Sequence, residues 1–446
     1  MSTKIIHWLT KHTTSFASVL ELKSTIIPRI AHHVSRSKIS DNALKVLYRL
    51  KKGGFKAYLV GGGIRDLLLE LYPKDFDVVT DAHPKEIRRL FRNCRLIARR
   101  FRLAHIYFAS EIIEVATFRA RSIYLVLDNE QYARHDEDGM IIRDNIYGNI
   151  DEDVLRRDFT INALYYNIRD CSLVDYVGGL EDIKKRQLRI IGDSYVRYCE
   201  DPVRMLRAIR LAIKLDFSLH IDTELHIKTL ASNIQNVPGG RLFEEMIKLF
   251  LSGYGYAIFE KLKYFGIFKY LFPQTHRCLD LNLIVFLLIK EFLLNTDIRI
   301  AEHKSVSSAF LFAVFLWYPV KAKIDECIEY GLLMHTCYQY AIGKILGEQL
   351  KIISLPKRII QMMREIWLLQ LCLAEYSRRD VFRLYQLPRF RAAYDFLLIR
   401  AKFGGEGTSR SLVVWWKAFV VGNDYNRLSM ANDLSSRSTK CFFLKN

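Results

Sequence analysis

The chain has 446 residues, more than one hydrophobic core usually contains, so we expect two to four packed units. Half of the residues are hydrophobic and only 9 are proline, which excludes a disordered or fibrous protein. The net charge of +19 favours a polyanionic partner, with nucleic acid as the leading interpretation and a membrane surface or a ribosomal neighbour as alternatives. The apolar runs are shorter than the roughly 20 residues of a membrane helix, so no membrane span is predicted.

The eight cysteines include no closely spaced pair, which argues against a zinc site and favours reduced thiols in a cytoplasmic protein. Residues 1–38 show little periodicity and are predicted to be a basic N-terminal extension. A helix is predicted from Ser40 or Asp41, where leucines begin to recur at helical spacing, to the glycine pair Gly53 and Gly54.

The stretch from Leu59 to Asp81 carries the strongest pattern in the chain. An apolar strand, Ala57 to Val60, runs into three glycines, Gly61 to Gly63, and an amphipathic helix follows them. Glycines at a helix N-terminus let backbone N–H groups approach a phosphate, and the helix dipole favours an anion. Because Gly61 and Gly62 are followed by Arg65, the turn is predicted to bind phosphate, although a glycine-rich turn alone is also common without a ligand.

A second strand is predicted after Pro73, because polar and apolar residues alternate from Lys74 to Val79. This period places Asp75 and Asp77 on the same face. Two carboxylates this close repel each other unless a cation lies between them, which favours a divalent-metal site. A solvated strand face is the alternative for these two residues taken alone.

The next segments are a short helix, Pro84 to Phe91, and an arginine-rich stretch from Arg95 to Ile106. That stretch is either a solvated basic edge or an element that contacts phosphate, and both interpretations stay open. Ile112 to Arg119 is predicted to be a strand in which Glu114 stands alone among apolar residues, where burial is costly unless the acid is paired or bound to metal. Arg121 to Met140 is polar and irregular, which predicts a mobile loop.

Two later motifs combine acids with arginines. If Arg156 to Ala163 is helical, Asp158 and Asn162 lie four residues apart on one face with Arg157 beside them, although a salt-bridged surface helix has the same pattern. Asp201 precedes Pro202 as in an ordinary helix start, but Arg204 and Arg207 then lie on one face of the following helix. An aspartate and an arginine presented together can accept from and donate to a base edge.

From about Tyr254 onward the pattern is helical, and its aromatic and methionine stripes predict a core rather than a binding surface. Taken together, the motifs resemble the class II nucleotidyltransferases, which comprise bacterial poly(A) polymerases and CCA-adding enzymes. The resemblance runs from about Ile39 to Trp416. The segment from Leu96 to His105 looks like the signature of the poly(A) polymerases, with Ala98 where the family usually has glycine.

The resemblance implies an α/β nucleotidyltransferase palm domain followed by all-α neck and body domains. The head would span residues 39–172, and a neck that recognises the nucleotide base would span 173–260, with a hinge at Leu173 to Gly179. The body and an RNA-binding C-terminal region would occupy 261–446.

The resemblance also implies roles for individual residues. Asp75, Asp77 and Glu114 match the catalytic carboxylates that hold two Mg²⁺ ions, with Mn²⁺ as an alternative. ATP would be bound by a larger set of residues: Gly61, Gly62, Arg65, Arg157, Asp158, Asn162, Asp201, Arg204 and Arg207.

The implied function is template-independent addition of AMP from ATP to RNA 3′ ends by two-metal in-line transfer, in the cytoplasm of a bacterium. Such polyadenylation promotes RNA decay, so RNA-decay proteins are expected partners besides RNA 3′ ends and ATP. Two alternatives stay open: a CCA-adding tRNA nucleotidyltransferase, and a non-catalytic RNA-binding protein on the same scaffold.

Overall fold

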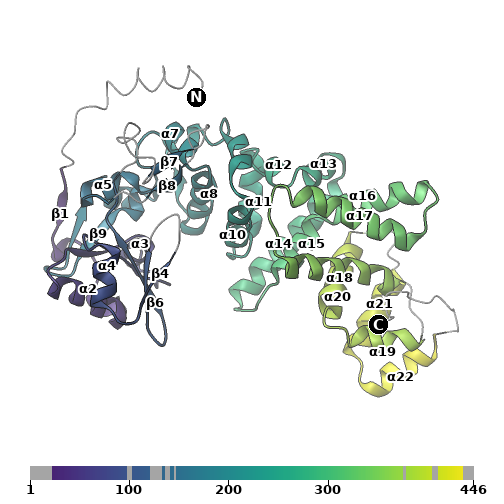
Figure 1. Ribbon diagram of the computed structural model, residues 1–446. Coiled ribbons are helices and arrows are strands. Elements are labelled where there is room, and N and C mark those ends of the chain that lie inside the picture. Colours follow the sequence, from purple (N-terminus) through teal and green to yellow (C-terminus); the bar gives the residue numbers. More distant parts are fainter. Residues whose placement is uncertain are drawn as a thin grey trace. The chain divides into compact units, whose positions relative to one another are not determined.

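The computed structural model describes residues 23–97, 103–120, 133–135, 141–144, 147–374, 378–403 and 410–434 (Figure 1). It divides into two compact units, Met1–Leu230 and Ala231–Asn446, and each is considered separately. Much of the predicted N-terminal extension, the arginines at positions 99, 100 and 102, and most of the loop predicted from Arg121 to Met140 lie outside the described residues.

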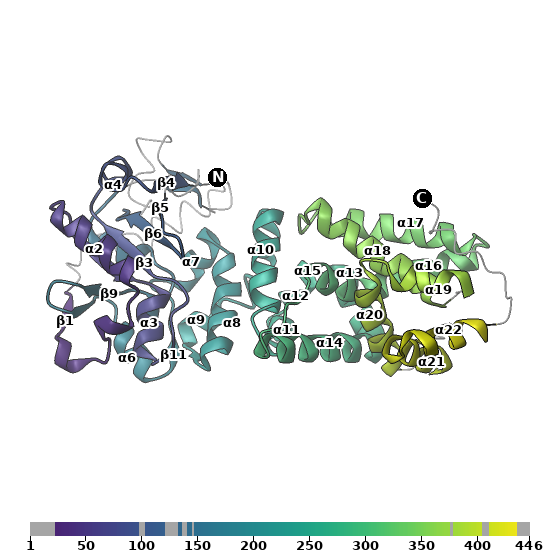
Figure 2. The same ribbon diagram turned by 90° about the horizontal axis from the view of Figure 1, so that it is seen from below.

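The first unit is built on a mixed eight-stranded sheet with the strand order β1-β10-β9-β2-β3-β6-β5-β4 (Figure 2). Strand β3 is central: it runs antiparallel to β2 and parallel to β6, whereas the other neighbouring pairs are antiparallel. The strands are β1 (Thr25–Ile27), β2 (Ala57–Val60), β3 (Asp77–Thr80), β4 (Cys94–Ile97), β5 (Leu103–Tyr107), β6 (Ile112–Thr117), β9 (Leu164–Asn167) and β10 (Ser172–Asp175). The predicted α/β head is therefore confirmed.

Helices that the sequence predicted from local signals cover this sheet. Helix α2 (Asp41–Lys52) begins where the Ser40 hydroxyl accepts the Ala43 N–H, and it ends at Gly53, as predicted. It packs on β2, β3 and β6, while α4 (Pro84–Leu90) packs on β4 and β5. Helix α3 (Gly62–Leu68) follows β2 directly, and α5 (Ile150–Arg156) follows the small sheet of β7 (Ala133–His135) and β8 (Ile141–Asp144). The loop predicted up to Met140 is wrong at β7, because that segment gains its strand structure by pairing with β8.

The segment predicted to be a hinge, Leu173 to Gly179, begins within a strand of the main sheet. Ser172–Asp175 is strand β10, held between β1 and β9 in the main sheet. The Asp175 carboxylate then accepts the backbone N–H groups of residues 177, 178, 179 and 180, which fixes the start of α6 (Gly179–Lys184). A head boundary at residue 172 therefore cuts through a paired strand, and β1 places part of the predicted N-terminal extension in the sheet as well.

The first unit continues into helices beyond the sheet. A short parallel pair, β11 (Gln187–Leu188) and β12 (Ser218–Leu219), brackets α7 (Ser194–Glu200) and α8 (Val203–Leu215), and α9 (Ile221–Leu225) follows. Helix α8 buries nine of its 13 residues, which anchors it firmly in this unit.

The second unit is helical throughout its described residues, which confirms the predicted all-α region. Phenylalanines from four helices meet at its centre: the rings of Phe250, Phe259, Phe268 and Phe272 all lie within 6.4 Å of the Phe315 ring. These phenylalanines are thus core, as predicted. The helices are α10 (Gly239–Phe250), α11 (Gly255–Tyr264), α12 (Phe268–Leu271), α13 (Pro273–Leu281), α14 (Leu283–Ala301), α15 (Ser308–Phe315), α16 (Trp317–Glu329), α17 (Met334–Gln349), α18 (Lys357–Ala374), α19 (Arg378–Tyr385), α20 (Phe390–Lys402), α21 (Arg410–Val421) and α22 (Asp424–Asn432).

Among the helices described, none combines the length and the apolar character needed to cross a membrane. Cys94, Cys171, Cys199, Cys278, Cys327 and Cys337 are free thiols. These six described thiols agree with the expectation of reduced cysteines.

Candidate active site

The glycine turn and the first acid of the site meet where β2 ends and β3 begins. Val60 pairs with Asp77 across these strands, and Gly61 follows with a φ of 82°. A Cβ atom on Gly61 would lie 3.0 Å from Asp77 Oδ2, so both the backbone conformation and the close approach of the carboxylate require glycine. The predicted turn is confirmed, with α3 beginning at Gly62.

Asp77 also lies beside Glu114, its partner across the parallel pair of β3 and β6. Burial, and then repulsion from Glu114 with a smaller contribution from Asp75, raises the pKa of Asp77 to about 6. A divalent cation would relieve this repulsion, and carboxylate oxygens are the ligands that Mg²⁺ prefers. The acids therefore fit the metal ions that the sequence predicted.

Asp75 stands apart from this pair. It precedes β3 instead of lying in it, because the strand begins at Asp77, three residues after the start of the alternating pattern at Lys74. Within the part of the chain that the structure describes, no three histidine, cysteine or acidic side chains are grouped closely enough to hold a metal ion. Asp75, Asp77 and Glu114 therefore form a pair with a nearby third acid, not a closed cluster.

A histidine supports the other side of Glu114. His105 pairs with Glu114 across β5 and β6, and its Nε2 atom lies 3.3 Å from Glu114 Oε1. The sequence placed His105 only at the end of a family signature. Its contact with the acid depends on strand register, which no local pattern in the sequence reveals.

A cavity of about 220 Å³ opens beside the two acids. Its walls include Asp77 and Glu114, three arginines, namely Arg119, Arg156 and Arg157, and apolar side chains from β3, β5 and β6. Positive and negative groups thus line one small space, as expected for a site that binds a polyanion together with a cation. Arg119 and Arg156 were not among the residues singled out in the sequence.

Arg157 is held firmly at the edge of this cavity. Its Nε and Nη2 atoms donate to Asp153 Oδ2 at 3.1 and 2.9 Å, and Nε also donates to the Tyr165 hydroxyl at 2.8 Å. Burial alone would raise the pKa of Asp153, but the charges of Arg157 and Arg156 and the hydrogen bonds from Tyr165 and Arg157 together outweigh burial, so the pKa is lowered. The sequence predicted Arg157, but it did not identify Asp153 or Tyr165.

The segment after Arg157 is not the α-helix considered for Arg156 to Ala163. Helix α5 ends at Arg156, Arg157 is extended, and Thr160–Asn162 forms a single 3₁₀ turn. Asp158 and Asn162 nevertheless meet: Asn162 Nδ2 donates to Asp158 Oδ1 at 3.3 Å. The two side chains therefore lie together, as a helical segment would also have placed them, although the segment is a 3₁₀ turn.

Two arginines from other elements join this pair. Arg65 Nη1 donates to Asn162 Oδ1 at 2.8 Å, and its remaining nitrogens donate to Asp66. Arg207 Nη2, from α8, lies 2.5 Å from Asp158 Oδ2. Burial would raise the pKa of Asp158, but Arg207 lowers it. A continuous polar chain thus links the glycine-turn helix to α8.

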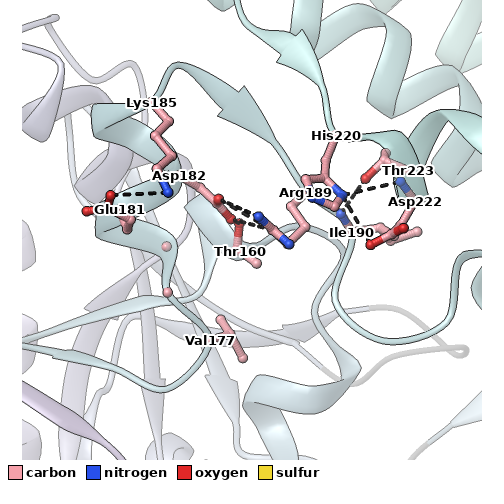
Figure 3. A network of polar contacts seen from close by, with 12 residues as sticks. Thr160, Val177, Glu181, Asp182, Lys185, Arg189, Ile190, His220, Asp222 and Thr223 are labelled. Atoms are coloured by element: carbon pink, nitrogen blue, oxygen red, sulfur yellow. Dashed lines mark hydrogen bonds and ion pairs between the residues drawn. The ribbon is translucent and has the colours of Figure 1, made fainter.

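A polar network fixes the backbone of this segment (Figure 3). The Thr160 hydroxyl donates to Asp182 Oδ2 at 2.7 Å, and Arg189 Nε donates to the same oxygen at 3.2 Å. The Thr160 N–H also donates to the Arg189 carbonyl at 3.0 Å, while the Ile190 N–H donates to the Thr223 hydroxyl at 2.9 Å. The loop that carries Asp158 and Asn162 is therefore bound on both sides, to α6 and to the segment after β11.

The predicted base-reading residues flank the junction of α7 and α8. The Asp201 carboxylate accepts the Val203 N–H at 3.2 Å, which supports the predicted helix start, although the helix itself begins at Val203. Arg204 is buried, and its Nη1 donates to the Arg197 carbonyl at 2.7 Å and to Glu200 Oε2 at 3.0 Å. Its guanidinium is thus oriented by neighbours that the sequence did not single out.

Arg197 connects the junction of α7 and α8 to Arg156 and Arg157. Its Nη1 donates to Glu200 Oε2 at 2.7 Å, and its Nη2 donates to the carbonyls of Arg156 and Arg157 at 2.7 and 2.6 Å. Arg197 is 1% exposed. The buried Arg197 side chain therefore joins the end of α7, next to the predicted base-reading residues, to the arginines that line the cavity.

Comparison with known proteins agrees with this arrangement. The family described as "Poly A polymerase head domain" matches residues 57–189, "Probable RNA and SrmB-binding site of polymerase A" matches residues 216–279, and "Polymerase A arginine-rich C-terminus" matches residues 330–442. The chain is 46% identical to Poly(A) polymerase I of Escherichia coli O6:H1 over 92% of this chain and 89% of that protein. It is 37% identical to the CCA-adding enzyme of Lactobacillus helveticus over 46% of this chain and 49% of that protein.

The fold is similar to the Thermotoga maritima CCA-adding enzyme complexed with tRNA, with a TM-score of 0.57 and 21% identity over 90% of this chain and 89% of that one. The mixed sheet, the glycine turn and the acid pair thus define a nucleotidyltransferase. Within that class, the chain belongs to the bacterial poly(A) polymerase family, and the CCA-adding enzymes are its more distant relatives.

Proposed function

We propose that this enzyme is a template-independent polynucleotide adenylyltransferase, which transfers AMP from ATP to RNA 3′ ends. The observation that carries the proposal is the acid pair beside the glycine turn, in a chain that matches proteins named Poly(A) polymerase I over nine-tenths of its length. We further propose that it acts in the bacterial cytoplasm, in RNA processing that promotes decay, together with RNA-decay proteins.

The acids and the glycine turn would bind the metal ions and the triphosphate. Asp77 and Glu114, with Asp75 adjusting toward them, would hold two Mg²⁺ ions, for which Mn²⁺ can substitute. Such ions supply positive charge that stabilises the transferring phosphate and the leaving pyrophosphate. The backbone at Gly61 and Gly62 would contact the triphosphate.

Other residues would hold the rest of the nucleotide. Arg65 donates to Asn162 and thereby fixes the orientation of its side chain. Asp158 and Asn162 would then present oxygens to the ribose hydroxyls. Arg157 would contact phosphate from the cavity wall, and Arg207 would keep Asp158 ionised. Asp201 and Arg204 would read the base edge of ATP, with Arg204 oriented by Glu200.

We also propose a functional division of the chain. The head would include the sheet through β10, a neck that recognises the base would follow up to about residue 260, and residues 261–446 would form the body and the RNA-binding C-terminal region. Matching residues 216–279 to a probable RNA-binding family supports an RNA contact that begins in the neck.

Primer extension tests the activity. Purified protein is incubated with Mg²⁺ and each nucleoside triphosphate separately, on an unstructured RNA and on a tRNA that lacks its 3′ end. We expect a long ladder with ATP alone on both RNAs, and none from the Asp77→Ala variant. Addition of two C residues and one A confined to the tRNA would instead establish a CCA-adding enzyme. RNA binding without extension would indicate a non-catalytic scaffold.

A further inference from the structure

Arg157 stands at a position where an arginine would normally be free to move. It directly follows the last residue of α5, its backbone is extended, and one-fifth of its side chain is exposed. A long side chain at a helix end loses rotamer entropy when it is held in one conformation, so a fixed guanidinium needs specific partners. The structure supplies two.

The first partner is the Asp153 carboxylate. Its Oδ2 atom accepts from Nε and Nη2 of Arg157 and also from the Tyr165 hydroxyl, at 2.9 Å. Asp153 is only 4% exposed, and a buried carboxylate without a partner would be strongly destabilising. Asp153 and Arg157 therefore fix each other within the last turn of α5.

The second partner is Tyr165, which belongs to the central sheet through β9. Its side chain is fully buried, and its ring makes edge contacts with Tyr58 and Tyr176 at centroid distances of 6.2 Å. The ring itself lies 5.2 Å below the Arg157 guanidinium. Because the core sets the ring position, the hydroxyl gives the guanidinium a reference point that does not depend on α5.

This arrangement directs Arg157 toward the reacting groups. Arg157 lines the same cavity as Asp77 and Glu114, and its charge lowers the pKa of Asp77 against the effects of burial and of Glu114. The hydrogen bonds to Asp153 and Tyr165 use Nε and Nη2, and none of the described hydrogen bonds of Arg157 uses Nη1. One edge of the guanidinium is therefore available to a phosphate oxygen.

We propose that Asp153 and Tyr165 are positioning residues that hold Arg157 in the orientation needed to bind the triphosphate of ATP. The inference rests on the proposed function, since it assigns the cavity edge to a nucleotide. Neither residue need touch ATP, and their effect would pass entirely through Arg157.

A double-mutant cycle tests this inference. Tyr165→Phe keeps the ring and removes only the hydroxyl, and it should raise the KM for ATP about tenfold, as expected when a charge-assisted hydrogen bond is lost, with little change in the KM for RNA. In an Arg157→Lys background the same change should have almost no further effect, because the group that Tyr165 positions is already gone. Asp153→Asn should behave likewise, but with a larger loss of stability.

Tyr198→Phe is the matched control. Tyr198 is also fully buried, and its hydroxyl also donates one hydrogen bond, at 2.6 Å, but the acceptor is the Thr223 carbonyl. The Tyr198→Phe variant should have a lower melting temperature than the parent but the same KM for ATP. If Tyr165→Phe changed only the melting temperature, or reduced kcat/KM by the same factor in both backgrounds, the positioning role would be overturned.

Calorimetric titration with ATP separates this inference from the proposed function. If the parent protein extends no RNA, the adenylyltransferase proposal fails, but Tyr165→Phe must still weaken ATP binding about tenfold for the positioning role to stand. Equal ATP affinity of the parent and the Tyr165→Phe variant would refute the positioning role even if the parent extended RNA normally.

Discussion

Asp77 occupies an environment that disfavours its own charge. Its pKa is raised from 3.8 to about 6 because it is buried and then because Glu114 repels it. The folded protein therefore binds the Asp77 proton more tightly than the unfolded chain does. The resulting contribution to stability is fully present below the unfolded pKa and is lost as the pH rises through about 6, where the folded protein must accept a buried negative charge.

Replacing Asp77 by asparagine should therefore stabilise the metal-free protein at neutral pH. The difference between 3.8 and about 6 corresponds to at most roughly 3 kcal/mol, reached above pH 6 and absent below pH 4. Urea denaturation of the parent and of Asp77→Asn at pH 4, 6 and 8, with a chelator present, measures this difference.

Magnesium should reverse the ranking at neutral pH. Mg²⁺ would bind the folded parent through Asp77 and Glu114 and raise its stability, while Asp77→Asn would gain little. The same denaturation series with Mg²⁺ supplies the comparison. An Asp77→Asn protein that was less stable than the parent at pH 8 without metal would contradict the pKa shift.

Some residues of the site could be predicted from the sequence and others could not. Gly61, Asp77 and Asp158 stand in short motifs whose chemistry is local, and their neighbours in the fold agree with it. His105 and Tyr165 reach the site only through strand register and sheet order. A sequence pattern with period two shows which face a side chain occupies, but it does not show which strand lies alongside.

At the scale of elements, one buried acid connects α7 to α8. Glu200 is 6% exposed and receives hydrogen bonds from both Arg197 and Arg204. Removing its charge would leave two guanidinium groups facing each other in a buried space, which is the costly way to break a buried ion pair.

Glu200→Gln should therefore lower stability by about 3 kcal/mol and release Arg204 from its orientation. Because Arg204 is proposed to read the base, the variant should also lose preference for ATP over the other nucleoside triphosphates. Competition assays with mixed nucleotides measure the preference, and thermal melts measure the stability. A variant that lost stability but kept full discrimination would show that Glu200 only stabilises the junction.

The turn between β2 and α3 can be tested separately at Gly61. Gly61→Ala would place a Cβ atom 3.0 Å from Asp77 Oδ2 and would force a non-glycine residue to adopt a φ of 82°. We expect a loss of about 1–2 kcal/mol of stability together with near-complete loss of extension activity. Gly54→Ala is the control, since Gly54 also has a positive φ but has no atom near the added Cβ. It should lose stability only.

Elements with local start and stop signals could be predicted closely. Helix α2 has a serine cap and a terminal glycine, and β2 and α4 likewise fall at the predicted residues. Local signals were less informative at Leu173–Gly179 and at Arg156–Ala163, because contacts from distant segments decide the structure there. Pairing with β1 and β9 makes the first a strand, and bonding to Asp182 and Arg189 holds the second as an irregular loop.

For the whole molecule, the net charge of +19 predicts how RNA binding responds to salt. Binding of RNA to a basic surface releases condensed counterions, so affinity should fall at least about tenfold between 50 and 200 mM salt. Filter binding of a 3′-labelled RNA across this range measures the slope. ATP binding, which we propose relies on buried and directed groups, should change much less. An equal salt dependence of RNA binding and ATP binding would show that bulk charge, not a defined nucleotide site, governs binding.

The position of β1 in the sheet has a consequence for synthesis of the chain. Strand β1 lies at residues 25–27, yet its partner β10 is formed by residues 172–175. A nascent chain that has emerged only as far as Glu114 already carries all three acids, but it cannot complete the sheet until β10 has left the ribosome. Closing such a long loop is slow, whereas helices that pack on sequence neighbours, such as α16 and α17, form quickly. During synthesis, the head should therefore expose unpaired strand edges until residue 175 emerges, which makes it the part of the chain most dependent on protection from aggregation.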